Sequence, residues 1–470
     1  MERVALLLTT LLLAGSARAG PEPGKVVLTV EQAVQVALAK NPSMRLAGLG
    51  VEAAEAGRKQ ARARFGPTLQ FEMRAMYFNE PPGFDAGGMD SGLIDQLQQI
   101  DDLARAQGDS VDQALSGALL GFGQSMLALP DMFASENYDV TVSVRLAQPL
   151  SQLWAIYQAY QLAELDVDIA KVAGLRARSR LGYQVRQACL QLLTARAGVA
   201  ALQEAQATVA AHVERAGHFV EVGLIGKNDL LQARARLAEL QSQLIAARHG
   251  LRLSRARLAM LLDLPVDTEI DLQQPPGDDS PEPPLAQVVG RALAARPEMR
   301  ELQLRIRQAE HGVKASWQGF IPGVTLLGQY QHNEGSLMIP PAWTVGVMVD
   351  FNVWEWGASY YALEQARVRL QQARTALGQL RRGIELEVRA AWLKLRQTRE
   401  QIAVARTALE AAAEQLRLER QRYEVQQSTS TDVLDAQSRL TQAKMRLESA
   451  RYQHLLARAA LRHASGQAEE

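Results

Sequence analysis

The sequence predicts a mainly α-helical protein with two repeats, each combining a long coiled-coil hairpin with a pair of amphipathic β-strands. Three observations lead to this fold class. The second half of the chain repeats the first, residues 150–264 and 342–470 contain no proline, and four short segments alternate apolar and polar residues. Only 5% of the residues are aromatic although 47% are hydrophobic, which is typical of long helices with narrow apolar seams.

Residues 1–19 have the pattern of a secretory signal peptide. Arg3 precedes an apolar run that ends at Leu13, and Ala17-Arg18-Ala19 is a small-x-small cleavage site. No cysteine follows this site, so we expect no lipid anchor on the new N-terminus. Cys189 is the only cysteine and cannot form an intrachain disulfide.

The charge balance of the chain limits the classes of partner that it can bind. The chain carries 51 basic and 51 acidic residues, and this neutrality argues against nucleic acid as a partner. Beyond the signal peptide, no apolar run is long enough to predict a transmembrane helix.

The internal repeat sets the domain organisation. A shift of 255 residues aligns 32–67 with 287–322 and makes 15 of 36 positions identical. Later in the chain the matching shift is 203, as for Asp229 and Asp432. The first repeat, residues 20–264, therefore carries 52 residues that the second, residues 285–470, lacks. Residues 265–284, rich in proline and acidic side chains, are predicted to be the linker.

Each repeat is predicted to begin with two shorter helices and to contain a very long one. In the first repeat we expect helices over about 29–40, 42–64, 151–222 and 228–262, with a reversal at Gly223–Asn228. The long helices of the second repeat are expected over about 357–465. The longest helix would measure about 100 Å at a rise of about 1.5 Å per residue. Two shorter helices stacked end to end along each long one, as in a coiled coil, fit these lengths.

Four segments are predicted to be strands, about residues 67–78, 139–148, 322–332 and 343–353. Their lengths approach the roughly 9–11 residues that cross a bilayer as a tilted strand. Membrane barrels have at least about eight strands, so several copies must pool theirs if these strands span a membrane. A small soluble sheet at the tip of a periplasmic coiled coil is the alternative. Aromatic residues at the strand ends are predicted to form an interfacial belt: Trp343, Trp354, Trp356, Tyr77 and Phe78.

The insertion lies at about residues 80–136, between the first two strands. It contains ten acidic residues and a single basic one, Arg105. Leu93, Leu97, Ile100 and Ala104 form a short helical stripe. A long surface loop and a lid or plug over the outer mouth of a barrel are both consistent with this pattern.

Several motifs point to one family. The repeats open with LTVEQAVQVALAKNP and PLAQVVGRALAARP, Pro67 and Pro322 stand at the helix-to-strand junctions, and DVLDAQ occupies 432–437. With these motifs the chain resembles the TolC-type outer-membrane efflux proteins over nearly its whole mature length. The resemblance implies a homotrimer whose chains each donate four strands to a trimeric twelve-stranded membrane β-barrel. It also implies a periplasmic α-barrel formed by the long helical hairpins.

The resemblance implies a passive channel in the outer membrane of a Gram-negative bacterium, with a large periplasmic portion. Its partners would be outer-membrane lipid, a periplasmic adaptor (membrane fusion protein) and an inner-membrane pump. The expected function is the exit duct of a tripartite efflux system for drugs or other small molecules. A duct for type I protein secretion and a periplasmic coiled-coil scaffold without a channel are the alternatives.

The search for chemistry agrees with a channel. The sequence has neither a GxxxxGK[ST] phosphate loop nor an HExxH motif, so we expect no enzyme activity, no cofactor and no metal centre. His212 and His218 lie six residues apart, off a shared helix face, and we interpret them as structural surface histidines. Cys189 is interpreted as a small buried or seam residue.

The turn RYEVQQSTSTDVLDAQ (422–437) repeats FVEVGLIGKNDLLQAR (219–234). The resemblance places the second copy at the periplasmic aperture, where Asp432 and Asp435 match acidic positions around the entrance and Tyr423 matches the turn tyrosine. Carboxylates from three chains would form an electrostatic filter or bind a divalent cation. The alternative role for Asp432 is a helix cap, because an acidic first turn is favoured by the helix dipole. Asp229 repeats Asp432 in the first copy.

The second turn departs from the family pattern at two positions. Gln426 stands where the family usually has glycine, which the first turn keeps as Gly223. Ser428 stands where some members have a basic residue that holds the turn closed. In the first turn, Gln232 replaces the second aspartate.

Overall fold

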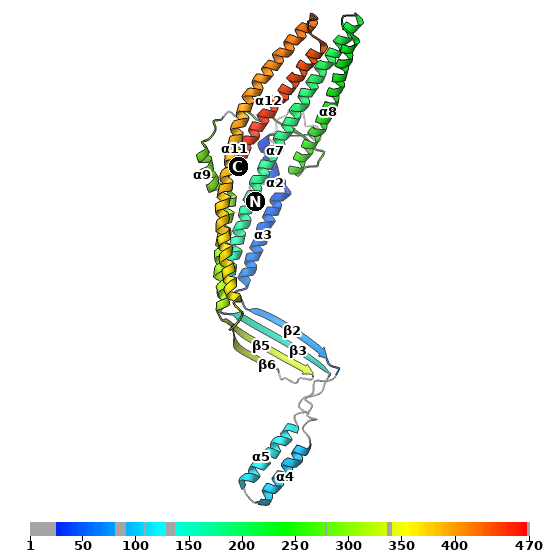
Figure 1. Ribbon diagram of the computed structural model, residues 1–470. Coiled ribbons are helices and arrows are strands. Elements are labelled where there is room, and N and C mark those ends of the chain that lie inside the picture. Colours follow the sequence, from blue (N-terminus) through cyan, green and yellow to red (C-terminus); the bar gives the residue numbers. More distant parts are fainter. Residues whose placement is uncertain are drawn as a thin grey trace, which may run out of the picture. The chain divides into compact units, whose positions relative to one another are not determined.

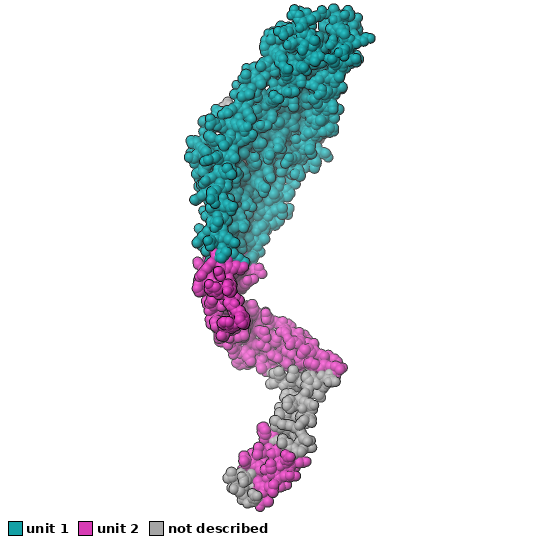
Figure 2. All heavy atoms as spheres, viewed as in Figure 1, with its two compact units in different colours: residues 1–57, 163–310, 368–470 teal, residues 58–162, 311–367 magenta. Residues whose placement is uncertain are grey.

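The structure is a computed structural model that describes residues 25–79, 91–107, 110–127, 137–277, 280–335 and 341–467. The predicted signal peptide lies outside these residues. The chain divides into two compact units, which Figure 2 shows in different colours. Unit 1 contains residues 1–57, 163–310 and 368–470, and unit 2 contains residues 58–162 and 311–367. Each unit contains parts of both repeats, so the repeats and the units divide the chain differently.

Long helices dominate the chain, as the sequence predicted (Figure 1). The helices α7 and α11 have 69 and 67 residues, about 100 Å each at the standard rise. None of the described helices combines the length and the hydropathy that a membrane-spanning helix needs. The first repeat supplies α2 (Val30–Lys40), α3 (Pro42–Ala63), α7 (Leu153–Glu221) and α8 (Lys227–Leu261), and the second supplies α9 (Leu285–Ala295), α10 (Pro297–Ala315), α11 (Ala358–Glu424) and α12 (Ser430–Ala464).

Local signals set the ends of the first helices. Thr29 caps α2 through a capping box in which its hydroxyl accepts from the Gln32 amide and the Gln32 side chain accepts from the Thr29 amide. The helix ends at Asn41 because Pro42 disfavours the helical conformation of the residue before it. The Asn41 side chain then donates to the Leu261 carbonyl at 2.8 Å, which ties the α2–α3 junction to the end of α8.

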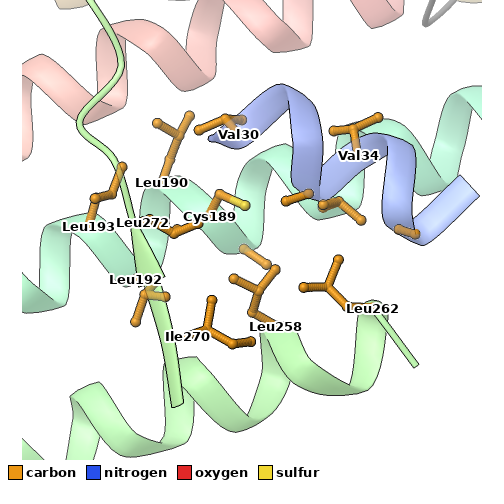
Figure 3. Close-up of a cluster of buried hydrophobic side chains, with 14 of the residues drawn as sticks. Val30, Val34, Cys189, Leu190, Leu192, Leu193, Leu258, Leu262, Ile270 and Leu272 are labelled. Atoms are coloured by element: carbon orange, nitrogen blue, oxygen red, sulfur yellow. The ribbon is translucent and has the colours of Figure 1, made fainter. Parts of the chain in front are cut away.

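A hydrophobic core joins α2, α7 and α8 in unit 1 (Figure 3). Val34, Cys189 and Leu258 are almost completely buried in it. The burial of Cys189 agrees with its interpretation from the sequence. Burial also raises the pKa of the Cys189 thiol to about 12, so the residue behaves as a small apolar side chain.

Two short strands complete this core. β1 (Lys25–Leu28) pairs in parallel with β4 (Glu269–Leu272), and Ile270 and Leu272 of β4 are buried in the cluster. Residues 265–284, predicted to be the linker between the repeats, therefore include the strand β4. The chain has these two strands in addition to the four that were predicted. Four residues of the composition EIDL are too few to show a strand period in the sequence.

Unit 2 contains a four-stranded antiparallel sheet in the order β2-β3-β5-β6. Its strands are β2 (Thr68–Tyr77), β3 (Tyr138–Pro149), β5 (Gly323–Gly335) and β6 (Ala342–Asp350). β6 ends at Asp350, before residue 353, where the sequence predicted its end. The chain then turns into α11 with Trp356 and Gly357 in the left-handed conformation. Within the described chain, β2 pairs only with β3 and β6 only with β5, which leaves both outer edges open.

The register of the sheet sorts its side chains by polarity. One row of paired residues across the four strands consists of Leu69, Leu146, Gly328 and Val345. Two residues further along the strands, on the same face, the row consists of Phe71, Val144, Tyr330 and Trp343. The row between them, on the opposite face, joins Gln70, Arg145, Gln329 and Thr344. The sheet therefore has one apolar face and one polar face, and many of the apolar side chains are exposed in the single chain.

The predicted insertion contains two helices within unit 2, α4 (Ser91–Gln107) and α5 (Ser110–Leu127). The helical stripe recognised in the sequence lies on α4. Residues 80–90 and 128–136 of the insertion lie outside the described residues.

Candidate functional site at the hairpin turns

The two hairpin turns of unit 1 have the same backbone hydrogen bonds. In the first turn, the Leu224 amide donates to the Phe219 carbonyl at 2.8 Å, and the Gly223 amide donates to Val220. The second turn repeats both bonds 203 residues later, from Gln427 to Arg422 and from Gln426 to Tyr423. This pair of bonds is the Schellman motif, which ends a helix with one residue in the left-handed conformation.

That left-handed residue differs between the turns. Gly223 has φ +75° and Gln426 has φ +61°. Glycine adopts this conformation freely, whereas a residue with a Cβ loses roughly 1–2 kcal/mol there. The departure from glycine noted in the sequence is therefore a strained position in the second turn.

Asp432 is part of a helix cap. Its carboxylate accepts from the Thr429 amide at 3.0 Å and from the Thr429 hydroxyl at 2.7 Å, while its own amide donates to the Thr429 side chain. The Ser428 hydroxyl lies 3.3 Å from the same carboxylate and 2.7 Å from that of Glu419. Hydrogen bonds from Thr429 and Ser428 lower the pKa of Asp432. The capping alternative considered from the sequence thus describes the contacts of Asp432.

The other two aspartates have different surroundings. Asp435 is exposed one turn further along α12, and no hydrogen bond or ion pair of its carboxylate is found among the described residues. Asp229 lies in the first turn of α8, whose N-cap, Gly226, offers no side-chain hydrogen bond. Within the part of the chain that the structure describes, no group of three histidine, cysteine or acidic side chains could hold a metal ion.

Tyr423 lies between the two hairpins. It is buried at the end of α11, and its ring centroid lies 5.0 Å from that of His212 and 6.0 Å from that of Phe219, both on α7. Its hydroxyl is buried without a hydrogen-bond partner among the described residues. Burial, followed by the charge of Asp229, raises the pKa of Tyr423. Its ring, rather than its hydroxyl, makes the contact between the hairpins.

His212 makes a second contact between the hairpins. Its Nε2 lies 2.8 Å from the Ser430 hydroxyl at the start of α12, and both side chains are buried. Burial, followed by the nearby charges of Arg215 and Arg420, lowers the pKa of His212 to about 4, so the ring is neutral at pH 7. The interpretation of His212 as a surface residue is wrong, whereas His218 is exposed.

Two further hydrogen bonds join α8 to α12. The Thr431 hydroxyl donates to the Gln232 side chain at 2.6 Å, and Arg236 donates to the Ser438 hydroxyl at 2.6 Å. The sequence reasoning missed these four residues, as well as His212 and Ser430, as contact residues. A signal for His212 does exist. The buried residues of α7 follow a heptad spacing that includes position 212: Leu202, Ala205, Val209, His212 and Ala216.

The aromatic residues predicted to form a belt lie at both ends of the sheet of unit 2. Tyr77 and Phe78 stand at the end of β2, and Trp343 stands near the start of β6, which is the same end of the sheet. Trp354 and Trp356 follow the other end of β6, with ring centroids 5.6 Å apart. Phe78 is half-buried and the other four are exposed.

Comparisons with known proteins agree with this architecture. Residues 288–467 match the outer membrane efflux protein family. The outer membrane efflux protein BepC of Brucella suis biovar 1 (strain 1330) is 25% identical over 300 residues, and the chain spans about 60% of its length. The outer membrane protein VceC of Vibrio cholerae superposes with a TM-score of 0.72 at 17% identity, covering 94% of this chain and 97% of VceC.

A second solved structure gives the same result. CusC, studied for its folding and transmembrane channel formation, superposes with a TM-score of 0.72 at 17% identity, covering 96% of this chain and 95% of CusC. At this identity the likeness concerns the fold. The second repeat thus carries the outer membrane efflux protein domain, and the chain as a whole has the fold of the outer membrane factors.

Proposed function

We propose that the protein is the outer-membrane exit duct of a tripartite efflux system. It conducts drugs or other small molecules passively from an inner-membrane pump and a periplasmic adaptor to the outside. The observation that carries the proposal is the register of the four-stranded sheet, which gathers apolar side chains on one exposed face and polar side chains on the other. An exposed apolar face of this extent is the lipid-facing surface of a membrane sheet.

The open edges support an assembly of copies. A sheet with unpaired edges is not tolerated in lipid, so β2 of one copy pairs with β6 of the next. Three copies give the twelve-stranded barrel of a homotrimer. The nine residues of β6 and the ten of β2 suffice to cross the hydrocarbon region when tilted, at about 9–11 residues per strand. The polar row with Arg145 then lines the lumen, and the aromatic residues at the strand ends lie at the two membrane interfaces.

Two neighbouring residues of β6 provide a matched test. Val345→Arg places a charge on the apolar face and is expected to cost about 2–4 kcal/mol in the bilayer, whereas Thr344→Arg points to the lumen and is tolerated. The measurement is the amount of heat-resistant trimer extracted by detergent from the outer-membrane fraction. Equal yields for both variants, or a protein soluble without detergent, would instead favour the periplasmic scaffold.

The transported substrate is a separate part of the proposal. The match to the efflux family supports small molecules, whereas a type I secretion duct would carry a protein through the same fold. Deletion of the gene should raise the susceptibility of the host to small toxic compounds and leave its secreted proteins unchanged. Loss of one secreted protein without a change in susceptibility would contradict the assignment.

We also propose that the second hairpin turn forms the periplasmic aperture. The exposed carboxylate of Asp435 is accessible to cations, while Asp432 is engaged in its cap and contributes charge only. Asp229 adds charge from the first turn. Opening of the aperture requires α11 and α12 to leave the first hairpin, so that the contacts of Tyr423, Ser430 and Thr431 are broken.

Divalent-cation block of single channels in planar bilayers tests the role of the aspartates. Asp435→Asn removes one carboxylate per chain and should weaken the block by roughly tenfold. This corresponds to a loss of about 1.4 kcal/mol in cation affinity. Asn at position 435 keeps the size of the side chain, and Gln232 of the first turn shows that an amide is accepted at the equivalent position. Unchanged block in the variant would remove Asp435 from the aperture.

A further inference from the structure

The helices α4 and α5 of the insertion pack into a two-helix hairpin (Figure 1). Its seam contains a polar group, since Asp101 of α4 is buried and accepts a 2.7 Å hydrogen bond from the Ser116 hydroxyl of α5. Arg105 forms an ion pair with Asp101 at 2.7 Å from one turn further along α4. A buried, paired polar group of this kind selects one register between two helices.

The hairpin leaves a set of large apolar side chains exposed. On α5 these residues follow one helical stripe, and on α4 two more lie beside the seam. In the single chain Phe122 is 66% exposed and Leu103 is 62% exposed. We call this set the apolar face of the hairpin: Ile100, Leu103, Leu115, Leu119 and Phe122.

Helix geometry places all five residues on the same side of the hairpin. At about 100° per residue, Ile100 and Leu103 lie on one side of the seam position Asp101. Leu115, Leu119 and Phe122 lie on the equivalent side of the seam position Ser116. Because the two helices run antiparallel, equal rotations from Asp101 on α4 and from Ser116 on α5 point to the same face of the hairpin. The opposite face presents small and polar residues: Gln98, Asp102, Gly117 and Gly121.

The connectivity places the hairpin at a defined end of the sheet. It is inserted between the end of β2 at Tyr77 and the start of β3 at Tyr138, which pair with each other. This is the end of the sheet opposite to the junctions with α3 and α7. In a barrel made of several copies, each copy therefore presents one hairpin at the same mouth.

Charge argues against lipid as the occupant of the apolar face. Helices that lie on a lipid surface carry lysine and arginine on their polar face. The insertion has ten acidic residues and only Arg105 as a basic one, and its polar side includes Asp102. An anionic headgroup layer would repel such a segment. The apolar face of another copy carries no charge itself, because its exposed residues are leucine, isoleucine and phenylalanine.

We propose that the apolar faces of the hairpins from different copies pack against one another and form a helical cap over the outer mouth of the channel. The inference rests on the proposed function, since it needs a barrel assembled from copies. Three copies of one patch that meet around the axis of a trimer bury an apolar surface that each copy alone leaves exposed.

Cysteine cross-linking in outer-membrane vesicles tests the cap. The full chain carries Leu115→Cys, Leu119→Cys or Phe122→Cys, and the control variants carry Gln98→Cys or Asp102→Cys on the opposite face. Cys189 is buried and stays unreactive. Because a disulfide needs Cα atoms within roughly 7 Å, the best apolar-face variant should give at least about tenfold more linked dimer than either control.

The outcomes separate this inference from the proposed function. A wild-type protein that is monomeric by mass in detergent would overturn both. A trimer in which no apolar-face cysteine forms a dimer, or in which both faces react equally, overturns the cap alone. Cysteines on the apolar face that resist a membrane-impermeant maleimide without cross-linking would indicate another occupant and overturn it as well.

Conductance gives an independent readout. Leu119→Asp together with Phe122→Asp places charges in the packed face and should raise the single-channel conductance of the trimer at least about twofold, because like charges buried together repel. Gln98→Asp with Gly117→Asp, on the opposite face, should leave it unchanged. Equal conductance of the two double variants contradicts the cap.

Discussion

The two hairpin turns share one backbone geometry but are held by different interactions. The first turn has glycine in the left-handed position and lacks a side-chain cap at Gly226. The second has a strained Gln426 and a complete capping box at Thr429, and its residues Tyr423 and Ser430 are buried against the first hairpin. The second turn thus depends on contact with its neighbour.

The largest difference between the turns should come from Tyr423. Tyr423→Ala removes a buried ring from the contact with α7 and is expected to cost about 3–5 kcal/mol locally. Hydrogen exchange of the amides around residues 420–435 should then become roughly 100- to 4,000-fold faster, since about 1.4 kcal/mol corresponds to a factor of ten.

Two controls sharpen this prediction. Val220→Ala, at the equivalent position of the first turn, should change exchange far less, because Val220 is smaller and only partly buried. Tyr423→Phe should be nearly neutral, since the hydroxyl has no hydrogen-bond partner among the described residues. A large effect of Tyr423→Phe would show that the hydroxyl, rather than the ring, makes the contact.

Acid should loosen the second turn before the first. The pKa of His212 is about 4 in the folded state, below its ordinary value of 6.5, so the unfolded state binds more protons between these pH values. The contribution of His212 is therefore fully present above about pH 6.5 and is lost as the pH falls towards 4, up to about 3 kcal/mol.

Hydrogen exchange tests this dependence. The rates of the second-turn amides are measured from pH 7 to pH 4 and corrected for the intrinsic exchange rate. His212→Gln keeps a hydrogen-bonding side chain without a titratable group and should flatten the profile. In the first turn, the protection of the amides after the same correction should not change over this pH range. A profile unchanged in His212→Gln would exclude the histidine as its source.

A reciprocal exchange of the left-handed residues tests the strain at Gln426. Gln426→Gly should stabilise the second turn by about 1 kcal/mol, and Gly223→Gln should destabilise the first by about 1–2 kcal/mol. A Cβ at Gly223 meets no atom within 4 Å, so the loss reflects the backbone alone. If both substitutions act in the same direction on local exchange, backbone strain does not distinguish the turns.

The smallest effect concerns the missing cap. Gly226→Thr would place threonine three residues before Asp229, which recreates the spacing of Thr429 and Asp432. Gly226 already has an extended backbone, and a Cβ there meets no atom within 4 Å. The gain should be about 0.5 kcal/mol, visible as slower exchange in the first turn of α8. Thr429→Ala is the converse change and should cost about 1 kcal/mol.

The periodic parts of the fold were predictable, and the pairings between distant segments were not. Alternation in residues such as Leu69, Phe71 and Met73 identified the strands, and their polarity anticipated the two faces of the sheet. The pairing of β1 with β4 joins residues more than 240 positions apart and leaves no local pattern. The bond from His212 to Ser430 joins residues 218 positions apart. The repeat gives no hint of it, because Gln415 and Lys227 occupy the equivalent positions.

The strand β4 has a consequence for the order in which the chain folds during export. Every buried member of the core around Cys189, except Tyr452, lies between Val30 and Leu272. The last two to emerge, Ile270 and Leu272, arrive on the strand that also pairs with β1. Once residue 272 has left the translocation machinery, the first repeat together with β4 holds nearly all the apolar surface that this core buries. We therefore expect it to begin folding while the second repeat is still being translocated, and to offer α12 a preformed surface.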